Sequence, residues 1–425
     1  MFALQTACSG GRAVAATQES DSTLARLLAE IQPDVERSSG MRAVRPLSVA
    51  RADSSRLTAY LESQLESQLP PSTASAITAA YARLGLVPDT LDLRALLEAL
   101  LQEQVVGWYD PVTDTLFVLE HVPEAQIEVV LAHELVHALQ DQHVDLDSLR
   151  NDIQPANDPT LAAQSAIEGH ATFAMMEWQM GRMTGGAADL TQLPDLGEQL
   201  SNLDLDALGD MASVAVLRAA PEIIREDLIF PYVGGLTFLQ RMWTAANGER
   251  PPPFGAALPA STEQVLHLDR YLAGDRPSTM TFSEPPPDGW EEVHSNGLGE
   301  LETRVFLAQH LGDEARAEAA AAGWDGDVYR LLRGPEGEAL VWVSVWDSEA
   351  EADEFAGAAR DAYRGRYDSP SGTAATTEAG SGAGRDTSVE RASIQGRPGV
   401  IIRDLPLGMP EDALEAMILT DLSDS

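Results

Sequence analysis

The segment His133-Glu134-Leu135-Val136-His137 constrains this chain of 425 residues more than any other feature. It lies within the apolar stretch Ile127 to Leu139, which is long enough for a buried helix. Residues four apart share one face of a helix, so the two imidazole rings point to the same place. Burying three ionisable side chains is costly unless partners or a cation stabilise them. The pattern therefore predicts a metal site on a helix from about Pro123 to Asp141.

The residue types and their order in this motif match the signature of zincin metalloproteases. Two histidine nitrogens can bind Zn²⁺ at about 2.1 Å, and the intervening glutamate can reach a water bound to the ion. We therefore expect Zn²⁺ as the cofactor, with His133 and His137 as two of its ligands. Glu134 is expected to be the catalytic residue, a general base for hydrolysis.

The third zinc ligand has two candidates, because catalytic zinc usually binds three protein side chains. His143 follows His137 at the metzincin spacing. However, Gln140 occupies the position where metzincins have a glycine that turns the chain. A helix that continues through Gln140 carries His143 roughly 15 Å along the axis from His133, out of reach of the metal.

Glu168 is the candidate that the sequence favours. It lies in the apolar part of a second long helix, predicted from Asp158 to Met183, where a carboxylate has few explanations other than a bound cation. A glutamate from a downstream helix completes the metal site in gluzincins. His170, two residues further along, lies on a different face of the helix. We expect it to be a hydrogen-bonded histidine, either in the core or beside the metal ligands.

Several segments resemble a family of uncharacterised bacterial gluzincin-type (HEXXH) zinc metallopeptidases. The resemblance covers roughly residues 100 to 365 and implies a zinc-dependent hydrolase fold, but no particular substrate. Tyr232 and His267 lie in two of these segments and are candidates for a donor that stabilises the oxyanion. The segments are Val106–Pro111, His133–Leu146, Glu168–Thr172, Phe230–Tyr232, Ser261–His267, Ala322–Asp327 and Trp346-Asp347.

Hydrophobic periodicity predicts an α+β fold: a mostly helical zincin-like catalytic domain with a small β-hairpin, and a small C-terminal α+β domain with an antiparallel sheet. The hairpin strands are expected at 105–109 and 115–119, and the second strand is expected to pair with an extended substrate. A helix over 216–247 is expected to break at Pro231 and at Gly234-Gly235, and 250–290 to be mostly irregular. Further helices are predicted at 54–66, 72–84, 89–103, 298–311, 313–322, 348–364 and 410–419, and strands at 327–333, 339–346, 388–394 and 398–403.

Composition along the chain predicts three parts. Residues 1–40 are small and polar, so we expect a flexible N-terminal segment. The zincin-like metallopeptidase domain is expected over 41–290 and the C-terminal α+β domain over 291–425. Within the last part, residues 366–388 are rich in Gly, Ser, Thr and Ala, which predicts a disordered insertion.

Charge and hydropathy exclude two classes of protein. The chain has 67 acidic and 28 basic residues, a net charge of −39, and so repels the phosphates of nucleic acids. No run of residues approaches the ~18 apolar positions that a membrane-spanning helix needs. The sequence therefore excludes a nucleic-acid partner and a polytopic membrane protein.

The single cysteine, Cys8, lies in a segment that resembles the end of a bacterial lipoprotein signal, where a small residue precedes a cysteine that becomes lipidated. This resemblance predicts a lipid anchor at Cys8 and an extracellular or cell-surface location. A cytoplasmic protein with a frayed N-terminus is the alternative.

Together these features predict a zinc-dependent metalloprotease that hydrolyses peptide bonds in a peptide or protein substrate. Two alternatives stay open. One is a metzincin-like site with His143 as the third ligand. The other is a non-catalytic, zinc-containing binding or scaffold protein, against which the intact Glu134 argues, because a structural zinc site has no use for a general base.

Overall fold

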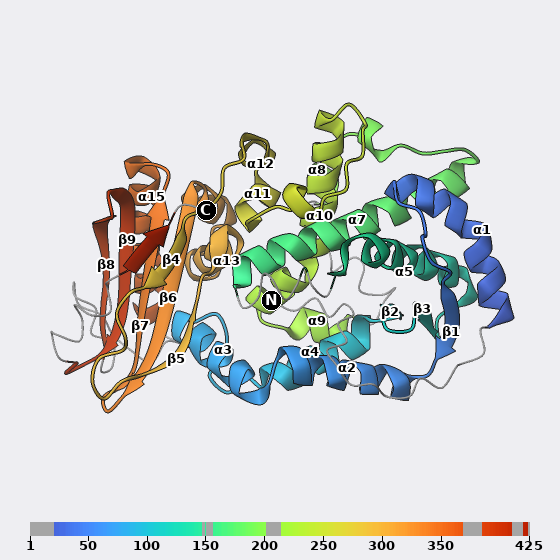
Figure 1. Cartoon of the computed structure of the whole chain (residues 1–425). Coiled ribbons are helices and arrows are strands. Elements are labelled where there is room, and N and C mark those ends of the chain that lie inside the picture. The colour runs from blue at the N-terminus through green and yellow to red at the C-terminus, as the bar shows by residue number, and fades with distance from the viewer. Residues whose placement is uncertain are drawn as a thin grey trace.

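The computed structural model describes residues 21–146, 149, 156–200, 214–368, 385–409 and 420–423. It confirms the α+β fold class: in Figure 1, one end of the molecule consists mainly of helices and the other carries a five-stranded sheet. The predicted lipid anchor Cys8 and the predicted helix over 410–419 lie outside the described residues. None of the helices described is both long and apolar enough to cross a membrane.

Three long helices form the centre of the helical end. They are α5 (Glu124–Val144), α7 (Asn157–Thr184) and α10 (Glu222–Ala245). The first two agree with the helices predicted for the metal motif and for Glu168. Both are buried along most of their middle turns, as expected for helices whose apolar residues extend around the circumference.

The predicted break in the third helix was wrong, because α10 continues through Pro231 and Gly234-Gly235. Proline removes one backbone hydrogen bond from a helix, but burial of the surrounding apolar face offsets that loss here. Gly235 has a packing role: a Cβ atom on it would overlap the backbone carbonyl of Ser165 in α7. A Cβ atom on Gly169 would likewise overlap the backbone of Gly235. The two glycines therefore let α7 and α10 cross with their backbones in contact.

A small sheet packs beside α5 and contains three strands in the order β1-β3-β2. The predicted hairpin is confirmed as β2 (Gly107–Asp110) and β3 (Thr115–Leu119), which pair antiparallel. The sequence did not predict β1 (Ser48–Ala52), which pairs with β3 in parallel. Since β3 is thereby paired on both sides, the expectation that residues 115–119 bind an extended substrate was wrong. Among the strands described, β2 is the edge strand nearest the metal motif.

The N-terminal part differs from the expected flexible segment. Helix α1 covers Ser22–Ser39, and Asp21 caps it by accepting hydrogen bonds from two backbone N–H groups of the first turn. Its buried residues, Leu24, Leu28, Ile31 and Val35, follow helical spacing. The prediction of a flexible segment was therefore wrong for Ser22–Ser39, while residues 1–20 lie outside the described chain.

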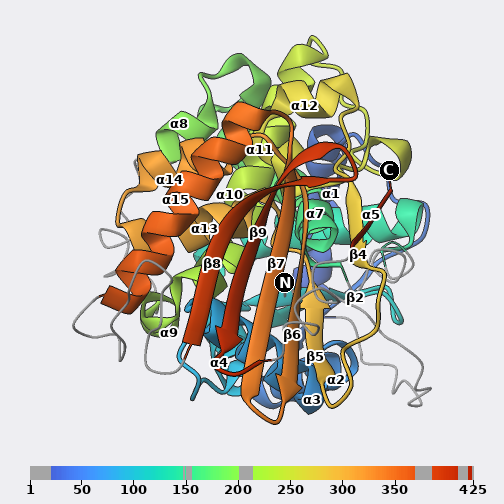
Figure 2. The same cartoon turned by 90° about the vertical axis from the view of Figure 1, so that its left-hand side faces the viewer.

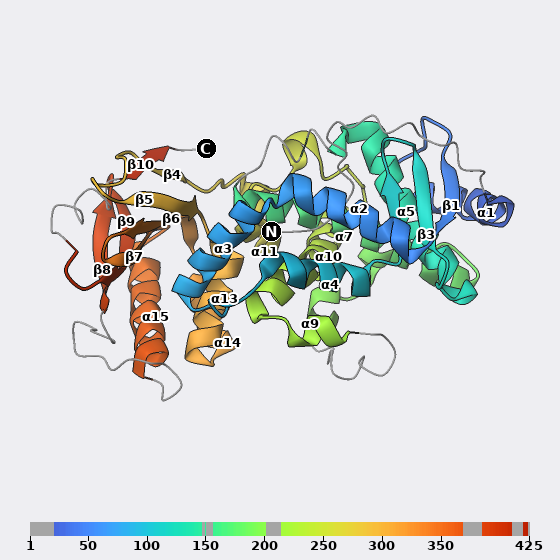
Figure 3. The ribbon, with the colours of Figure 1, turned by 90° about the horizontal axis from the view of Figure 1, so that it is seen from below.

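Three predicted helices lie along one side of the central helices, as Figure 3 shows. They are α2 (Ser54–Gln68), α3 (Pro71–Leu84) and α4 (Leu93–Gln104). Region 250–290, expected to be mostly irregular, contains short helices and a strand. The elements of this region are η2 (Gly255–Ala257), α11 (Thr262–Leu266), α12 (Leu268–Ala273) and β4 (Thr279–Phe282). Between α7 and α10 lie three further short helices, η1 (Leu190–Gln192), α8 (Leu196–Leu200) and α9 (Ala215–Ala219).

The C-terminal part is an antiparallel sheet in the order β5-β6-β7-β9-β8, with helices on one face (Figure 2). Strand β10 (Thr420–Ser423) pairs with β4 near the other face. Of the predicted disordered insertion, residues 369–384 lie outside the described chain. The strands are β5 (Glu291–Asn296), β6 (Trp324–Gly334), β7 (Gly337–Trp346), β8 (Arg385–Ile394) and β9 (Arg397–Pro406), and the helices are α13 (Gly299–Leu311), α14 (Glu314–Ala321) and α15 (Glu349–Asp368).

One hydrophobic cluster joins the two ends of the molecule. Tyr81 and Leu97 from the N-terminal helices belong to the same cluster as Phe306, Trp342 and Phe355 from the C-terminal part. The hydroxyl of Tyr81 also donates a buried hydrogen bond of 2.7 Å to Glu302 of α13. The domain boundaries drawn from the sequence stay predictions, but apolar packing is continuous across position 290.

We predict that Gly235→Ala destabilises the protein by at least about 2 kcal/mol, because the new methyl group has no space against the backbone of α7. Gly357→Ala is the control, since Gly357 lies inside α15 and its added Cβ meets no atom within 4 Å. That control is expected to leave stability unchanged or to raise it by up to about 1 kcal/mol. Thermal and urea unfolding measure both effects, and equal stability of the two variants would contradict the tight crossing.

Candidate metal centre

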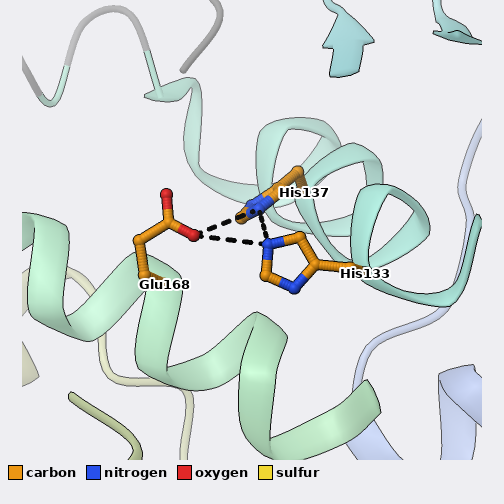
Figure 4. Close-up of side chains that lie close together, drawn as sticks. All are labelled: His133, His137 and Glu168. Carbon is orange, nitrogen blue, oxygen red and sulfur yellow. Dashed lines mark hydrogen bonds and ion pairs between the residues drawn. The ribbon is translucent and has the colours of Figure 1, made fainter. Parts of the chain in front are cut away.

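The structure brings His133, His137 and Glu168 together, as the sequence predicted for the metal ligands. The Nε2 atoms of the two histidines are 3.0 Å apart. Oε2 of Glu168 lies 3.4 Å from Nε2 of His133 and 3.6 Å from Nε2 of His137. Figure 4 shows the two rings on α5 facing the carboxylate that α7 supplies. Three potential ligand atoms therefore surround one point.

The spacing of these atoms fits a tetrahedral ion. Ligand bonds of about 2.1 Å at tetrahedral angles place neighbouring ligand atoms about 3.4 Å apart. The observed separations of 3.0, 3.4 and 3.6 Å lie around that value. The three residues could therefore hold a metal ion with little movement. A fourth position would remain for water or substrate.

The burial of Glu168 supports a cationic partner. Only 1% of this residue is exposed, and neither carboxylate oxygen has a hydrogen-bond partner in the part of the chain that the structure describes. Burial by itself raises the pKa of Glu168, but His137 and His133 outweigh it and lower the pKa to about 2. The carboxylate is therefore ionised and needs a positive charge beside it, either protonated imidazole or a metal ion.

A chain of hydrogen bonds determines which nitrogen of His137 would face a metal ion. Nε2 of Gln140 donates to the backbone carbonyl of Ile167 over 2.9 Å, and a carbonyl can only accept, so the amide orientation is determined. Oε1 of Gln140 then accepts from Nδ1 of His137 at 2.8 Å. Nδ1 of His137 carries the proton, and in the neutral ring Nε2 keeps a free lone pair directed at the site.

The same chain continues to the N-terminal helix. Nε2 of Gln140 lies 3.1 Å from Nδ1 of His170, which accepts its second hydrogen. Nε2 of His170 then donates to the backbone carbonyl of Ser39 over 2.9 Å. Burial lowers the pKa of His170 to about 4, so the ring is neutral as this pattern requires. The expectation that His170 is a hydrogen-bonded histidine of the core or of the ligand surroundings agrees with these contacts.

Glu134 lines the same cavity as the two histidines. Burial raises the pKa of Glu134, while the charges of His137 and His133 and the backbone N–H of Tyr109 act in the opposite direction. A carboxyl group with a raised pKa is suited to exchanging protons near neutral pH. From its place in the cavity wall beside the two histidines, Glu134 could act as a general base.

Tyr232 also lies at the cavity. Its ring stacks on that of His133, with centroids 6.2 Å apart. Although 39% of Tyr232 is exposed, desolvation of its hydroxyl and the charges of Glu168 and Glu134 raise the pKa of Tyr232 well above its ordinary value. The hydroxyl therefore stays protonated and is able to donate a hydrogen bond toward the site.

His143 and His267 are not brought to the metal ligands. Helix α5 continues past Gln140, and Nδ1 of His143 hydrogen-bonds to the carbonyl of Leu139 at 2.8 Å within the last turn of the helix. His267 is absent from the cavity at the motif, and its Nε2 pairs with Oε1 of Glu300 at 2.7 Å. The geometry therefore favours Glu168 over His143 as the third ligand, and it gives His267 a partner in α13 instead.

Sequence reasoning missed the function of Gln140, which it used only as a helix former. A signal was present, since Gln140 shares the interior-facing side of the helix with His133 and His137, and buried amides need partners. It also missed the contact between Gly169 and Gly235, which places Tyr232 and Glu168 on crossing helices. No local pattern identifies which two glycines on separate helices will meet.

Comparisons with known proteins are sparse. Residues 285–412 match a family described as "Domain of unknown function (DUF8575)", a range without any of the candidate ligands. No curated protein matches the chain. A solved structure described as a "putative hydrolase with a novel fold" from Chloroflexus aurantiacus is 17% identical, with 59% of this chain and 88% of that chain covered and a TM-score of 0.35. So distant a likeness carries no argument, and the gluzincin family stays a prediction.

We predict that Glu168→Ala abolishes tight Zn²⁺ binding, because it removes one of three ligand atoms. His143→Ala is the matched control and is expected to keep the affinity within a few fold, since His143 bonds only to its own helix. Competition with a chromophoric chelator measures both dissociation constants. A larger loss of zinc affinity in His143→Ala than in Glu168→Ala would show that His143, and not Glu168, is the third ligand.

We also predict that Gln140→Ala weakens Zn²⁺ binding roughly 10- to 100-fold, because His137 loses the partner that orients its ring. Gln142→Ala, two residues further on the same helix, serves as the control: its side chain bonds to the backbone of Val44 and Arg45, away from the ligands. The same competition titration applies. Unchanged affinity in Gln140→Ala, with the protein still folded by circular dichroism, would show that the hydrogen-bond chain has no influence on the metal.

Proposed function

We propose that this protein is a zinc metallopeptidase that hydrolyses peptide bonds at the His133, His137 and Glu168 centre. The observation that carries the proposal is the presence of Glu134 beside the two histidines, in the wall of a cavity that adjoins the metal centre. A site that only holds a structural ion is closed by protein ligands and needs no carboxylate poised next to it.

The chain's own residues supply the steps of hydrolysis. When bound, zinc lowers the pKa of a water to about 7 and polarises the substrate carbonyl. Glu134 accepts a proton from the attacking water and delivers it to the leaving nitrogen, which is why a raised pKa suits it. The Tyr232 hydroxyl, kept protonated, donates to the oxygen on which negative charge develops.

The choice of zinc rests on the donor set. Two imidazole nitrogens and one carboxylate, with room for a fourth ligand, form a set typical of catalytic zinc. Magnesium and calcium prefer sites built from oxygen ligands, whereas two of the three candidate ligand atoms among the described residues are nitrogens. We therefore expect one equivalent of zinc per chain, measurable by elemental analysis after reconstitution.

We predict that Glu134→Gln keeps zinc affinity but lowers the rate of peptide hydrolysis by at least 10²-fold, because glutamine preserves the shape of the side chain and cannot accept a proton. The assay is cleavage of unfolded casein or of a peptide mixture, with and without a chelator. If Glu134→Gln cleaves peptides at the wild-type rate, Glu134 is not the general base. If the metal-free protein still cleaves peptides, the metallopeptidase proposal is wrong.

A further inference from the structure

We propose that the substrate is a peptide with a large apolar side chain next to the cleaved bond, and that the cavity beside the metal centre binds this side chain. The inference rests on the proposed function and adds the chemical class of its substrate. It is carried by the lining of the cavity, by the aromatic wall at Trp108 and by the free edge of strand β2.

The cavity has a volume of about 440 Å³ and extends from the metal ligands between β2 and three helices. This volume exceeds what one water or a small ion needs, and it is within the range of sites that bind organic groups. Its apolar walls come from Tyr60 and Leu61 of α2, Leu100 and Leu101 of α4, and Leu228 and Ile229 of α10.

The described residues that line the cavity offer no charge that could balance a charged substrate side chain. Apart from Glu134 and the two histidines of the centre, none of these described lining residues is an arginine, aspartate or glutamate. A charged side chain that entered would lose its hydration without gaining an ionic partner. An apolar side chain gains about 25 cal/mol for each Å² removed from water, so the lining selects for it.

One wall is a rigid stack of aromatic rings. Trp108 packs between Tyr60 at 5.3 Å and Phe117 at 4.8 Å, measured between ring centroids, and both pairs are stacked. Ring-to-ring packing of this kind restricts rotation of the central side chain. A fixed apolar wall beside the reacting centre cannot collapse around a small side chain, so it favours a bulky one.

The backbone of β2 indicates that the occupant is an extended peptide. Leu119 donates to the carbonyl of Val106 at 3.0 Å, and hydrogen-bonded pairs alternate along an antiparallel ladder. The N–H and C=O groups of Gly107 and Tyr109 therefore point away from β3, toward the open edge. The N–H of Tyr109 is directed at Glu134, so this edge lies at the reacting groups.

Gly107 allows strand β2 to pack closely against helix α5. A Cβ atom on it would meet a methyl group of Val130 at 2.5 Å and the carbonyl of Phe117 at 2.8 Å. The glycine thus lets β2 lie close against α5, one helical turn before Glu134. An extended peptide that pairs with the N–H and C=O groups of Gly107 and the C=O group of Tyr109 would have its scissile bond beside Glu134 and a neighbouring side chain in the cavity.

Cleavage of a diverse peptide mixture, read by mass spectrometry, tests the proposal. We expect a large aromatic or aliphatic residue at one fixed position beside the cleaved bond. For a peptide pair that differs at this position, kcat/KM is expected to be at least 10-fold higher with Phe than with Ala, as a difference of several buried methylene groups implies. No preference among cleaved bonds, or a preference for charged residues, would overturn the inference.

Two substitutions of Leu228 connect that preference to the cavity. Leu228→Trp fills the space and is expected to lower the Phe-to-Ala ratio of kcat/KM at least 10-fold, and Leu228→Ala enlarges it and is expected to shift the preference toward Trp. Leu272→Trp is the control, because Leu272 is 60% exposed on α12 and outside the cavity. An unchanged ratio in both Leu228 variants would overturn the assignment of the cavity.

The outcomes separate this inference from the proposed function. If zinc-loaded wild-type protein cleaves no peptide, the metallopeptidase proposal fails. If the protein cleaves peptides in a chelator-sensitive way but without the expected preference, only the substrate inference fails. Because Leu228→Ala removes atoms and Leu228→Trp adds them, misfolding of one variant still leaves the other to decide the test.

Discussion

The rest of the site depends on one buried charge, the carboxylate of Glu168 held against two imidazole rings. Such a charge is tolerated in an apolar interior only where positive partners lie within a few ångströms. Helix α7 must therefore approach α5 at one particular turn. The glycine contact between α7 and α10, one residue after Glu168, sets the position of that turn and brings Tyr232 against the ring of His133.

The ligand geometry is also tied to the N-terminal helix. Hydrogen bonds lead from His137 through Gln140 and His170 to the carbonyl of Ser39 at the end of α1. Arg250 strengthens the same attachment, since it donates to the carbonyl of Ser38 over 2.9 Å and pairs with Glu177 of α7. The orientation of the candidate metal ligand His137 thus depends on the docking of a helix roughly a hundred positions earlier in the chain.

The small sheet supplies the strand at which we propose that the substrate binds. Strand β3 lies between β1 and β2, which leaves β2 as the strand whose free groups face the cavity. The sequence predicted the hairpin correctly, because an Asp-Pro turn between two apolar runs is a local pattern. It assigned the wrong strand to the substrate, because the partner that covers β3 lies some sixty residues upstream, at Ser48–Ala52.

What the sequence by itself determined is local. The spacing of His133 and His137, the helix that carries them, and the placement of Glu168 in an apolar stretch all follow from periodicity within one segment. Tertiary structure alone decided the pairing of β1 with β3, the docking of α1, the continuity of α10 through Pro231 and the hydrogen-bond partners of Gln140. Each of these features depends on contacts between segments that are far apart in the chain. Packing of these segments against one another makes the folded arrangement more favourable than the conformations that each segment would adopt alone.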